Sequence, residues 1–173
     1  MNITGGIYNG RKVQAPDEKI TRPTLSKVRM SVFNSLYSEL STFENKTFLD
    51  MFGGSGIMGL EALSRGFKSV TVFEKNRQSA EIIKNNYKTL GLKPNLMIGD
   101  SLKLIQKITD NFDVIYIDPP YTSGVYEQCL TQIHNANIII LEHSAEVDTT
   151  GYTIIKQKKY GDTYITFLKK ELN

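Results

Sequence analysis

Between residues 47 and 142, short apolar runs alternate with segments of helical periodicity. This alternation predicts a parallel β-sheet covered by helices on both faces, which is a Rossmann-like α/β fold. The expected strands are Thr47–Met51, Ser69–Glu74, Asn95–Asp100, Phe112–Ile117 and Asn137–Glu142. The expected helices are Ile57–Ser64, a helix that is capped by Asn76 and stops at Gly91, Ser101–Ile108 and Val125–Ile133.

The last part of the chain departs from this alternation. The apolar runs Tyr152–Ile155 and Thr163–Leu168 are separated by a short segment that contains Gly161-Asp162. That segment is too short for a helical crossover, so an antiparallel hairpin is expected to complete the sheet.

The first part of the chain also stands apart, and residues 1–46 are expected to form an N-terminal extension to a core domain of residues 47–173. Asn9-Gly10 within Ile7–Val13 favours a small β-hairpin with a type I′ turn. Thr24 is expected to cap an amphipathic helix that runs from Leu25 to Leu40. A chain of 173 residues suits one domain with such an appendage.

Acidic residues end three of the expected parallel strands. Asp50, Glu74 and Asp100 follow successive apolar runs, and the carboxyl ends of parallel strands form the edge where ligands bind in open α/β sheets. Each acid alone is equally typical of a helix cap or a solvated loop. Together, three acids at one edge indicate a polar binding site.

A glycine-rich loop, Phe52-Gly53-Gly54-Ser55-Gly56, follows the first strand and opens a helix. With Gly59 it satisfies the Gly-x-Gly-x-x-Gly pattern of dinucleotide-binding proteins, in which glycines let the backbone approach a ligand closely. A NAD-dependent dehydrogenase would need a second nucleotide-binding half and a substrate domain, for which this chain has no room. Asp50 beside the loop would also repel a pyrophosphate.

The strand-end acids favour a ligand with an adenosine half and a cationic half. Asp50 suits a cation, Glu74 can accept hydrogen bonds from ribose hydroxyls, and Asp100 can accept one from the exocyclic amine of adenine. S-adenosylmethionine carries an ammonium and a sulfonium beside its adenosine. It is therefore the expected cofactor.

The segment Asp118-Pro119-Pro120-Tyr121 follows the strand Phe112–Ile117 directly. The Asp118 carboxylate and the Pro119 carbonyl can each accept one N–H of an amino group, and the two prolines fix the geometry of the turn. Tyr121 offers an aromatic face to a base that has left its stack. The segment thus predicts methyl transfer to an exocyclic amine, although an acid beside a rigid turn is also common.

Other chemistries find little support in the sequence. His134 and His143 are the only histidines and neither belongs to a cluster with metal-ligand spacing, so no metal site is expected. The single Cys129 is expected to be a packed thiol. Ser55 lies outside any Gly-x-Ser-x-Gly pattern, which leaves a hydrolase unsupported.

Charge and hydropathy bear on partners and location. Residues 1–30 carry a net charge of +4 and residues 151–173 one of +3, whereas residues 31–150 carry −4. Basic ends suit a polyanionic partner, and Arg11, Lys12 and Arg22 are candidate contacts for one. No apolar run of about 18 residues and no secretory signal is evident, so a cytoplasmic location and no membrane partner are expected.

Short segments spread over nearly the whole chain form a further pattern: Ile3-Thr4-Gly5-Gly6, Gly10-Arg11-Lys12, Arg22-Pro23-Thr24, Val28-Arg29, Phe33-Asn34, Leu49–Gly56, Gly59–Gly66 and Asp118–Tyr121. In these segments the chain resembles the RNA small-subunit methyltransferase D family. The resemblance implies a class I methyltransferase with a seven-stranded, mostly parallel sheet and an antiparallel last strand. It also implies transfer of a methyl group from S-adenosylmethionine to the N2 amine of a guanine in 16S ribosomal RNA.

By this resemblance, Asp50 to Gly56, Glu74 and Asp100 belong to the cofactor pocket, and Asp118 to Tyr121 form the catalytic loop. Gly53 stands where the family is expected to have alanine, and this difference is expected to leave cofactor binding intact. Arg22 and the hairpin are expected to lie near RNA, which is either free or part of an assembling small subunit. No obligate protein partner is evident. A DNA adenine or cytosine amino-methyltransferase and a non-catalytic RNA-binding factor remain as alternatives.

Overall fold

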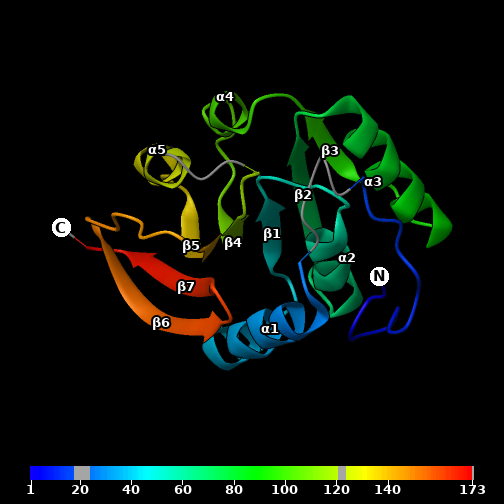
Figure 1. Cartoon of the computed structure of the whole chain (residues 1–173), viewed down its shortest axis with the longest axis horizontal. Coiled ribbons are helices and arrows are strands. Elements are labelled where there is room, and N and C mark those ends of the chain that lie inside the picture. The colour runs from blue at the N-terminus through cyan, green and yellow to red at the C-terminus, as the bar shows by residue number, and fades with distance from the viewer. Residues whose placement is uncertain (18–23, 121–123, 173) are drawn as a thin grey trace.

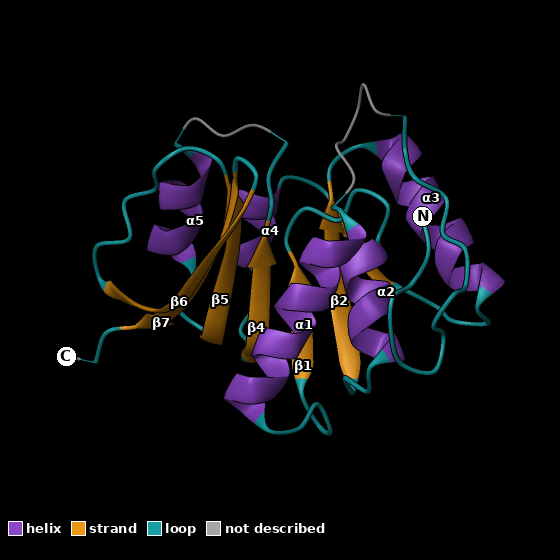
Figure 2. Cartoon of the chain, turned by 60° about the horizontal axis from the view of Figure 1, so that its bottom comes forward, coloured by secondary structure: helices purple, strands orange, loops and turns teal. Residues whose placement is uncertain are grey.

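A seven-stranded sheet with helices on both faces runs through the molecule in the computed structural model, which describes residues 1–17, 24–120 and 124–172 (Figures 1 and 2). The strands are β1 (Thr47–Asp50), β2 (Ser69–Glu74), β3 (Asn95–Ile98), β4 (Phe112–Ile117), β5 (Ala136–His143), β6 (Tyr152–Tyr160) and β7 (Thr163–Lys170). The helices are α1 (Ser26–Leu40), α2 (Ile57–Ser64), α3 (Arg77–Thr89), α4 (Ser101–Ile105) and α5 (Val125–Gln132). None of the described helices is long and apolar enough to cross a membrane.

The strand order is β3-β2-β1-β4-β5-β7-β6. The first five strands in this order pair in parallel, whereas β7 pairs antiparallel with both β5 and β6. This is the class I methyltransferase fold, and the predicted seven-stranded sheet with an antiparallel last strand is confirmed. Strands β6 and β7 are longer than the apolar runs alone indicated, because lysines continue both of them.

Two apolar layers fill the space between the sheet and its helices. One layer joins α1, α2 and α3 to one sheet face, and the other joins α4 and α5 to the opposite face, as Figure 2 shows. Neighbouring strand residues alternate between the layers, so that Phe48 packs in the first and Leu49 in the second. Cys129 is buried in the second layer, in agreement with its predicted role as a packed thiol.

The N-terminal segment forms a hairpin, but with a different turn from the predicted one. Residues 1–3 run antiparallel to residues 11–13, and a wider loop connects them. Gly10 has a φ of +83°, whereas Asn9 has no positive φ, so the turn is not of type I′. Long-range contacts of this loop with α2 determine its course, since the amide of Ile7 donates to the carbonyl of Ser64 at 2.8 Å.

The start of α1 also differs from the prediction. Leu25 is the cap residue and no side chain caps the helix. The Thr24 hydroxyl instead donates to the Glu142 carboxylate at 3.4 Å, so the tertiary contact with β5 replaces the local one expected from the sequence. The apolar side of α1 enters the first layer through Val28, Val32, Phe33 and Leu36.

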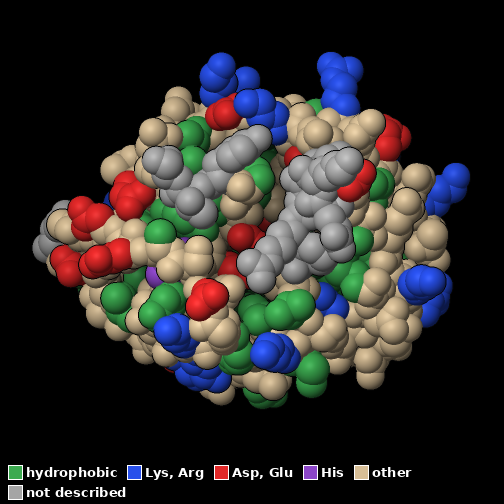
Figure 3. All heavy atoms as spheres, viewed as in Figure 1, with side chains coloured by type: hydrophobic (Ala, Val, Ile, Leu, Met, Phe, Trp, Pro, Cys, Tyr) green, Lys and Arg blue, Asp and Glu red, His purple; other side chains and the backbone are tan. Residues whose placement is uncertain are grey.

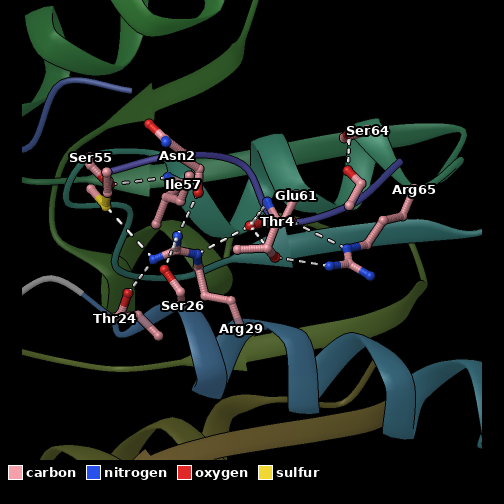
Figure 4. Close-up of polar contacts among 12 residues, drawn as sticks. Asn2, Thr4, Thr24, Ser26, Arg29, Ser55, Ile57, Glu61, Ser64 and Arg65 are labelled. Atoms are coloured by element: carbon pink, nitrogen blue, oxygen red, sulfur yellow. Dashed lines mark hydrogen bonds and ion pairs between the residues drawn. The ribbon is translucent and has the colours of Figure 1, made fainter. Parts of the chain in front are cut away.

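A buried ionic network fastens the N-terminal segment to the sheet domain (Figure 4). Arg29 of α1 and Arg65 at the end of α2 each contact Glu61 of α2, with Nε–Oε distances of 3.1 and 3.2 Å. The backbone amide and hydroxyl of Thr4 also donate to Glu61 at 2.8 Å, and Arg29 donates to the carbonyl of Asn2 at 2.7 Å. Since Arg29 is 1% exposed and Glu61 fully buried, both charges depend on these partners.

Candidate active site

The carboxyl edge of the parallel strands brings acidic side chains together. Asp50 ends β1, Glu74 ends β2, Asp118 follows β4 and Glu142 lies near the end of β5. In the space-filling view of this face, Asp and Glu side chains lie in a hollow near its centre (Figure 3). The sheet order places β1 between β2 and β4, so Asp50 occupies the middle of the acidic edge.

Asp50 is buried, with 1% of its surface exposed. The backbone amide of Phe52 donates to its carboxylate at 3.2 Å. The pKa of Asp50 is raised to about 7, chiefly by burial and also by the charges of Glu74 and Glu142, against the weaker lowering effect of that hydrogen bond. A cation beside this carboxylate would stabilise its charged form, and the predicted role of Asp50 as the partner of a cationic ligand stays a prediction.

The glycine loop follows Asp50 and contacts the end of β2, where the amide of Gly53 donates to the carbonyl of Phe73 at 2.9 Å. The amide of Gly54 donates to Glu74 Oε2 at 2.7 Å, and the amide of Asn76 donates to Glu74 Oε1 at 2.9 Å. These bonds fix the Glu74 carboxylate while leaving acceptor sites, because a carboxylate can accept about four hydrogen bonds. Gly56, with a φ of +80°, caps α2 in a conformation that suits glycine. Ser55 is buried, and its hydroxyl accepts from the amide of Ile57 at 3.2 Å.

Gly53 lies in a space that its neighbours have already filled. A Cβ at this position would lie 2.4 Å from Cγ1 of Val72 and 3.0 Å from Cδ1 of Ile83. The alanine expected at this place in the family therefore does not fit the present packing. Val72 and Ile83 occupy the volume of the missing methyl group, so an alanine at this position would force these side chains to shift.

Gly53→Ala is expected to lower the free energy of unfolding by about 1–3 kcal/mol through overpacking. Urea denaturation would measure the loss. The same Gly53→Ala change should cost less free energy of unfolding when it is made in a Val72→Ala background, because the colliding methyl group of Val72 is then absent. An unchanged unfolding midpoint for Gly53→Ala would contradict the crowding that the packing indicates.

Asp100 stands at the start of α4, where its carboxylate accepts from the amide of Lys103 at 3.1 Å. Asp100 therefore caps α4, which the sequence analysis gave as the alternative role for an acid at a strand end. Its side chain is partly exposed. Asp100 lies after β3, the edge strand of the sheet on this side. A cap uses one of its oxygens and does not prevent the other from accepting a hydrogen bond from a ligand.

The segment after β4 is described as far as Pro120. Asp118 is partly exposed, Pro119 is buried and Pro120 is exposed. Ile117 pairs with Leu141 in the parallel ladder, so the next residues, Asp118 and Glu142, are neighbours at the same edge. Tyr121 and Arg22, which the sequence nominated as contacts for a base and for RNA, lie outside the described residues.

Glu142 is a residue of this edge that the sequence analysis did not nominate. The hydroxyl of Tyr116 donates to its carboxylate, as does that of Thr24, and the hydroxyl of Tyr126 donates to its backbone carbonyl. Burial and the charge of Glu142 raise the pKa of Tyr116 well above its usual value. The strand-end rule that selected Asp50 would also have selected Glu142, since Glu142 follows the run 138–141.

The two candidate RNA contacts in the N-terminal hairpin lie away from this edge. Arg11 donates to the carbonyl of Thr89, the last residue of α3, at 3.1 Å. Lys12 is exposed in the same region and lines a shallow hollow with Gln14 and Asn85. Helix α3 begins beside the carboxyl edge and runs back toward the opposite edge, so its last turn is remote from Asp118.

Comparisons with known proteins agree with this fold. The family model "Conserved hypothetical protein 95" matches residues 1–169. The Bacillus subtilis (strain 168) protein named "Putative rRNA methyltransferase YlbH" is 32% identical, over 98% of this chain and 99% of that protein. "Ribosomal RNA small subunit methyltransferase D" of Haemophilus influenzae is 29% identical, over 93% of this chain and 89% of its own.

Among solved structures, that of yhhF from Escherichia coli has the same fold, with a TM-score of 0.86 and 24% sequence identity. The match covers 99% of this chain and 98% of that one. With a class I methyltransferase fold, acids along its carboxyl edge and a family model that spans residues 1–169, the chain belongs to the family described as "Conserved hypothetical protein 95", and its resemblance to ribosomal RNA small subunit methyltransferase D is confirmed.

Proposed function

We propose that the protein transfers a methyl group from S-adenosylmethionine to the exocyclic N2 amine of a guanine in small-subunit ribosomal RNA. The observation that carries this proposal is the position of Asp118 and Pro119 at the end of β4, directly beside β1, which ends in Asp50. An amine-orienting pair thus lies next to a carboxylate that favours a cation. The names of the two curated relatives support ribosomal RNA as the substrate.

The residues present fit S-adenosylmethionine. Asp50 is buried without a cation beside it in the described part of the chain, and its raised pKa reflects this environment. Glu74 is held by two backbone amides in an orientation that leaves acceptor capacity for ribose hydroxyls. We assign Asp50, Phe52–Gly56, Glu74 and Asp100 to the cofactor site. When bound, the cofactor supplies an electrophilic methyl group on its sulfonium.

The chain's own contribution to the reaction is orientation and charge. The Asp118 carboxylate and the Pro119 carbonyl each accept one N–H of the target amine, which turns its lone pair out of conjugation with the base. The carboxylate also stabilises the positive charge that develops on nitrogen. Tyr121 is assigned to the base from the sequence, and Glu142 supports the edge through its bonds with Tyr116 and Thr24. In this scheme residues 47–173 perform the transfer and residues 1–46 contribute to RNA contact.

Nucleoside mass spectrometry of small-subunit ribosomal RNA tests the proposal directly. A strain that lacks the protein should lose one N2-methylguanosine, and the wild-type gene should restore it. In vitro, tritiated methyl groups should pass to ribosomal RNA, free or within subunits from that strain, and not to duplex DNA. An unchanged nucleoside profile in the deletion strain, or transfer to DNA alone, would refute it.

The pKa of Asp50 predicts how stability depends on pH. The folded state holds a proton on this group up to about pH 7, whereas the unfolded state loses it near pH 4. The free energy of unfolding should therefore decrease as the pH rises from about 4 to about 7. The contribution is complete below pH 4 and absent above pH 7. Asp50→Asn should remove this part of the pH dependence. The free energy of unfolding of the variant should therefore increase relative to that of the wild type as the pH rises from 4.5 to 8.

Urea denaturation of both proteins at pH 4.5, 6 and 8, without cofactor, would measure the difference. Asp148→Asn serves as the control, since Asp148 is an exposed acid whose pKa is lowered by hydrogen bonds from Thr150. If the free energies of unfolding of wild type and Asp50→Asn changed with pH in the same way, burial of Asp50 would not raise its pKa.

A further inference from the structure

The turn of the β6–β7 hairpin reaches the carboxyl edge of the sheet. Tyr164 of β7 pairs with His143, at the carboxyl end of β5, and Lys159 of β6 pairs with Tyr164. The opposite end of the same hairpin holds Lys169 and Lys170, which pair with the first residues of β6. The hairpin therefore carries lysines at both ends, and only one end lies on the side of the active-site acids.

Helix α1 extends this lysine-bearing surface. The Nζ of Lys158 donates to the hydroxyl of Ser31 at 3.5 Å, and the hydroxyl of Tyr160 donates to the same oxygen. Lys27 lies one helical turn before Ser31, on the same side of α1, and is exposed. In Figure 3, Lys and Arg side chains lie over β6 and α1, beside the face that holds the acidic hollow.

These lysines have no carboxylate partner within residues 1–17, 24–120 and 124–172. The three ion pairs found there are Arg29–Glu61, Arg65–Glu61 and Lys84–Glu81. Lys159 instead covers the ring of Tyr164, 5.3 Å from its centroid, and that ring stacks on His143. Because the aromatic rings are engaged within the protein, the surface offers positive charge rather than platforms for bases.

Lys156 and Lys158 pair with Phe167 and Ile165 of the layer beneath α1, whereas Lys159 pairs with Tyr164 and points to the other side of the edge strand β6. We infer that Lys27, Lys156 and Lys158 on the α1 side of β6, together with Lys159 on its other side, form a contact surface for the phosphate backbone of an RNA strand that crosses this edge. We call this set the hairpin lysines. The inference rests on the proposed function, and it adds a position for the RNA: a strand whose guanine reaches Asp118 passes over the end of the C-terminal hairpin and the first turns of α1. The hairpin residues Arg11 and Lys12 lie by the last turn of α3, farther from that path.

Lysines on an edge strand have another established role, because they discourage pairing with a second chain. β6 is the edge strand of the sheet, so this explanation applies to Lys158 and Lys159, whereas Lys169 and Lys170 belong to β7, which β6 covers. RNA contact and edge protection predict different effects on RNA affinity when each lysine pair is removed. Only an RNA surface makes Lys158 and Lys159 more important for RNA than Lys169 and Lys170.

The test compares two double variants of equal charge, Lys158→Gln/Lys159→Gln and Lys169→Gln/Lys170→Gln. Binding to protein-free 16S ribosomal RNA is measured between 50 and 400 mM salt, and kcat and KM for methyl transfer are measured on the same RNA. Loss of two phosphate contacts should weaken binding roughly 10- to 50-fold at 0.1 M salt and reduce the slope of log K against log salt by about 1.4–1.8. KM should rise while kcat stays near the wild-type value.

The control variant should bind and react like wild type, with a salt slope within error. An equal loss of RNA affinity in both variants, or no loss in either, would overturn the inference. Neither outcome would bear on methyl transfer by the wild-type protein, so the proposed function would stand. Self-association of Lys158→Gln/Lys159→Gln without loss of RNA affinity would support the edge-protection role and also overturn it. A wild-type protein that neither binds nor methylates this RNA, free or within subunits, would instead refute the proposed function, and the inference with it.

Discussion

Asp118→Ala is expected to lower kcat for methyl transfer by about 10²- to 10⁴-fold. The variant loses the carboxylate that is proposed to orient the amine and to stabilise its developing charge. Affinity for S-adenosylmethionine should change little, because the residues proposed to hold the cofactor, Asp50 and Glu74, lie on β1 and β2. Single-turnover assays on ribosomal RNA and calorimetric titration with the cofactor would separate the two effects.

Two further variants make this result specific. Asp118→Asn keeps the size of the side chain and one acceptor oxygen, so it should retain more activity than alanine does. Asp110→Ala removes an exposed acid just before β4 and should behave like wild type. If Asp118→Ala kept a kcat within threefold of wild type, the orienting role of the carboxylate would have to be abandoned.

Glu61→Gln is expected to lower the free energy of unfolding by about 3–5 kcal/mol, because it leaves a buried guanidinium without its counter-charge. Arg29 is 1% exposed and has no other carboxylate partner in the described part of the chain. The loss should appear as a lower urea midpoint. Catalysis below the unfolding transition should persist, since Glu61 does not line the acidic edge.

Glu81→Gln is the matched control for this experiment. Glu81 also pairs with a basic residue, Lys84, at 2.8 Å, but its side chain is 66% exposed, so water replaces the lost contact. Its expected cost is below about 1 kcal/mol. Similar costs for the two variants would mean that the buried network contributes no more than a surface ion pair.

Local sequence patterns predicted much of the fold. Apolar runs ending in Asp50 and Glu74 marked β1 and β2 within a residue, and Asn76 caps α3 as expected, with its side chain accepting from the amide of Ser79 at 2.9 Å. These features depend on neighbours a few residues apart. The strand-end acids could be placed together for the same reason, because parallel strands align their carboxyl ends.

Features set by residues distant in the sequence escaped this reasoning. Thr24 contacts Glu142, which lies 118 residues away, and Arg29 meets Glu61 across 32 residues. No periodicity encodes such pairs. The crowding at Gly53 likewise depends on the packing of Val72 and Ile83, which a glycine-loop pattern does not contain.

The strand order also has a consequence for the synthesis of the protein. Every strand pairing of β6 is with β7, which follows it in the chain and lies between β6 and β5 in the sheet. Until residues 163–170 have left the ribosome, β6 has no strand partner and the edge of β5 that β7 will cover is unpaired. The parallel half of the molecule can therefore assemble during translation, whereas the hairpin that carries the proposed RNA contacts must wait for its second strand.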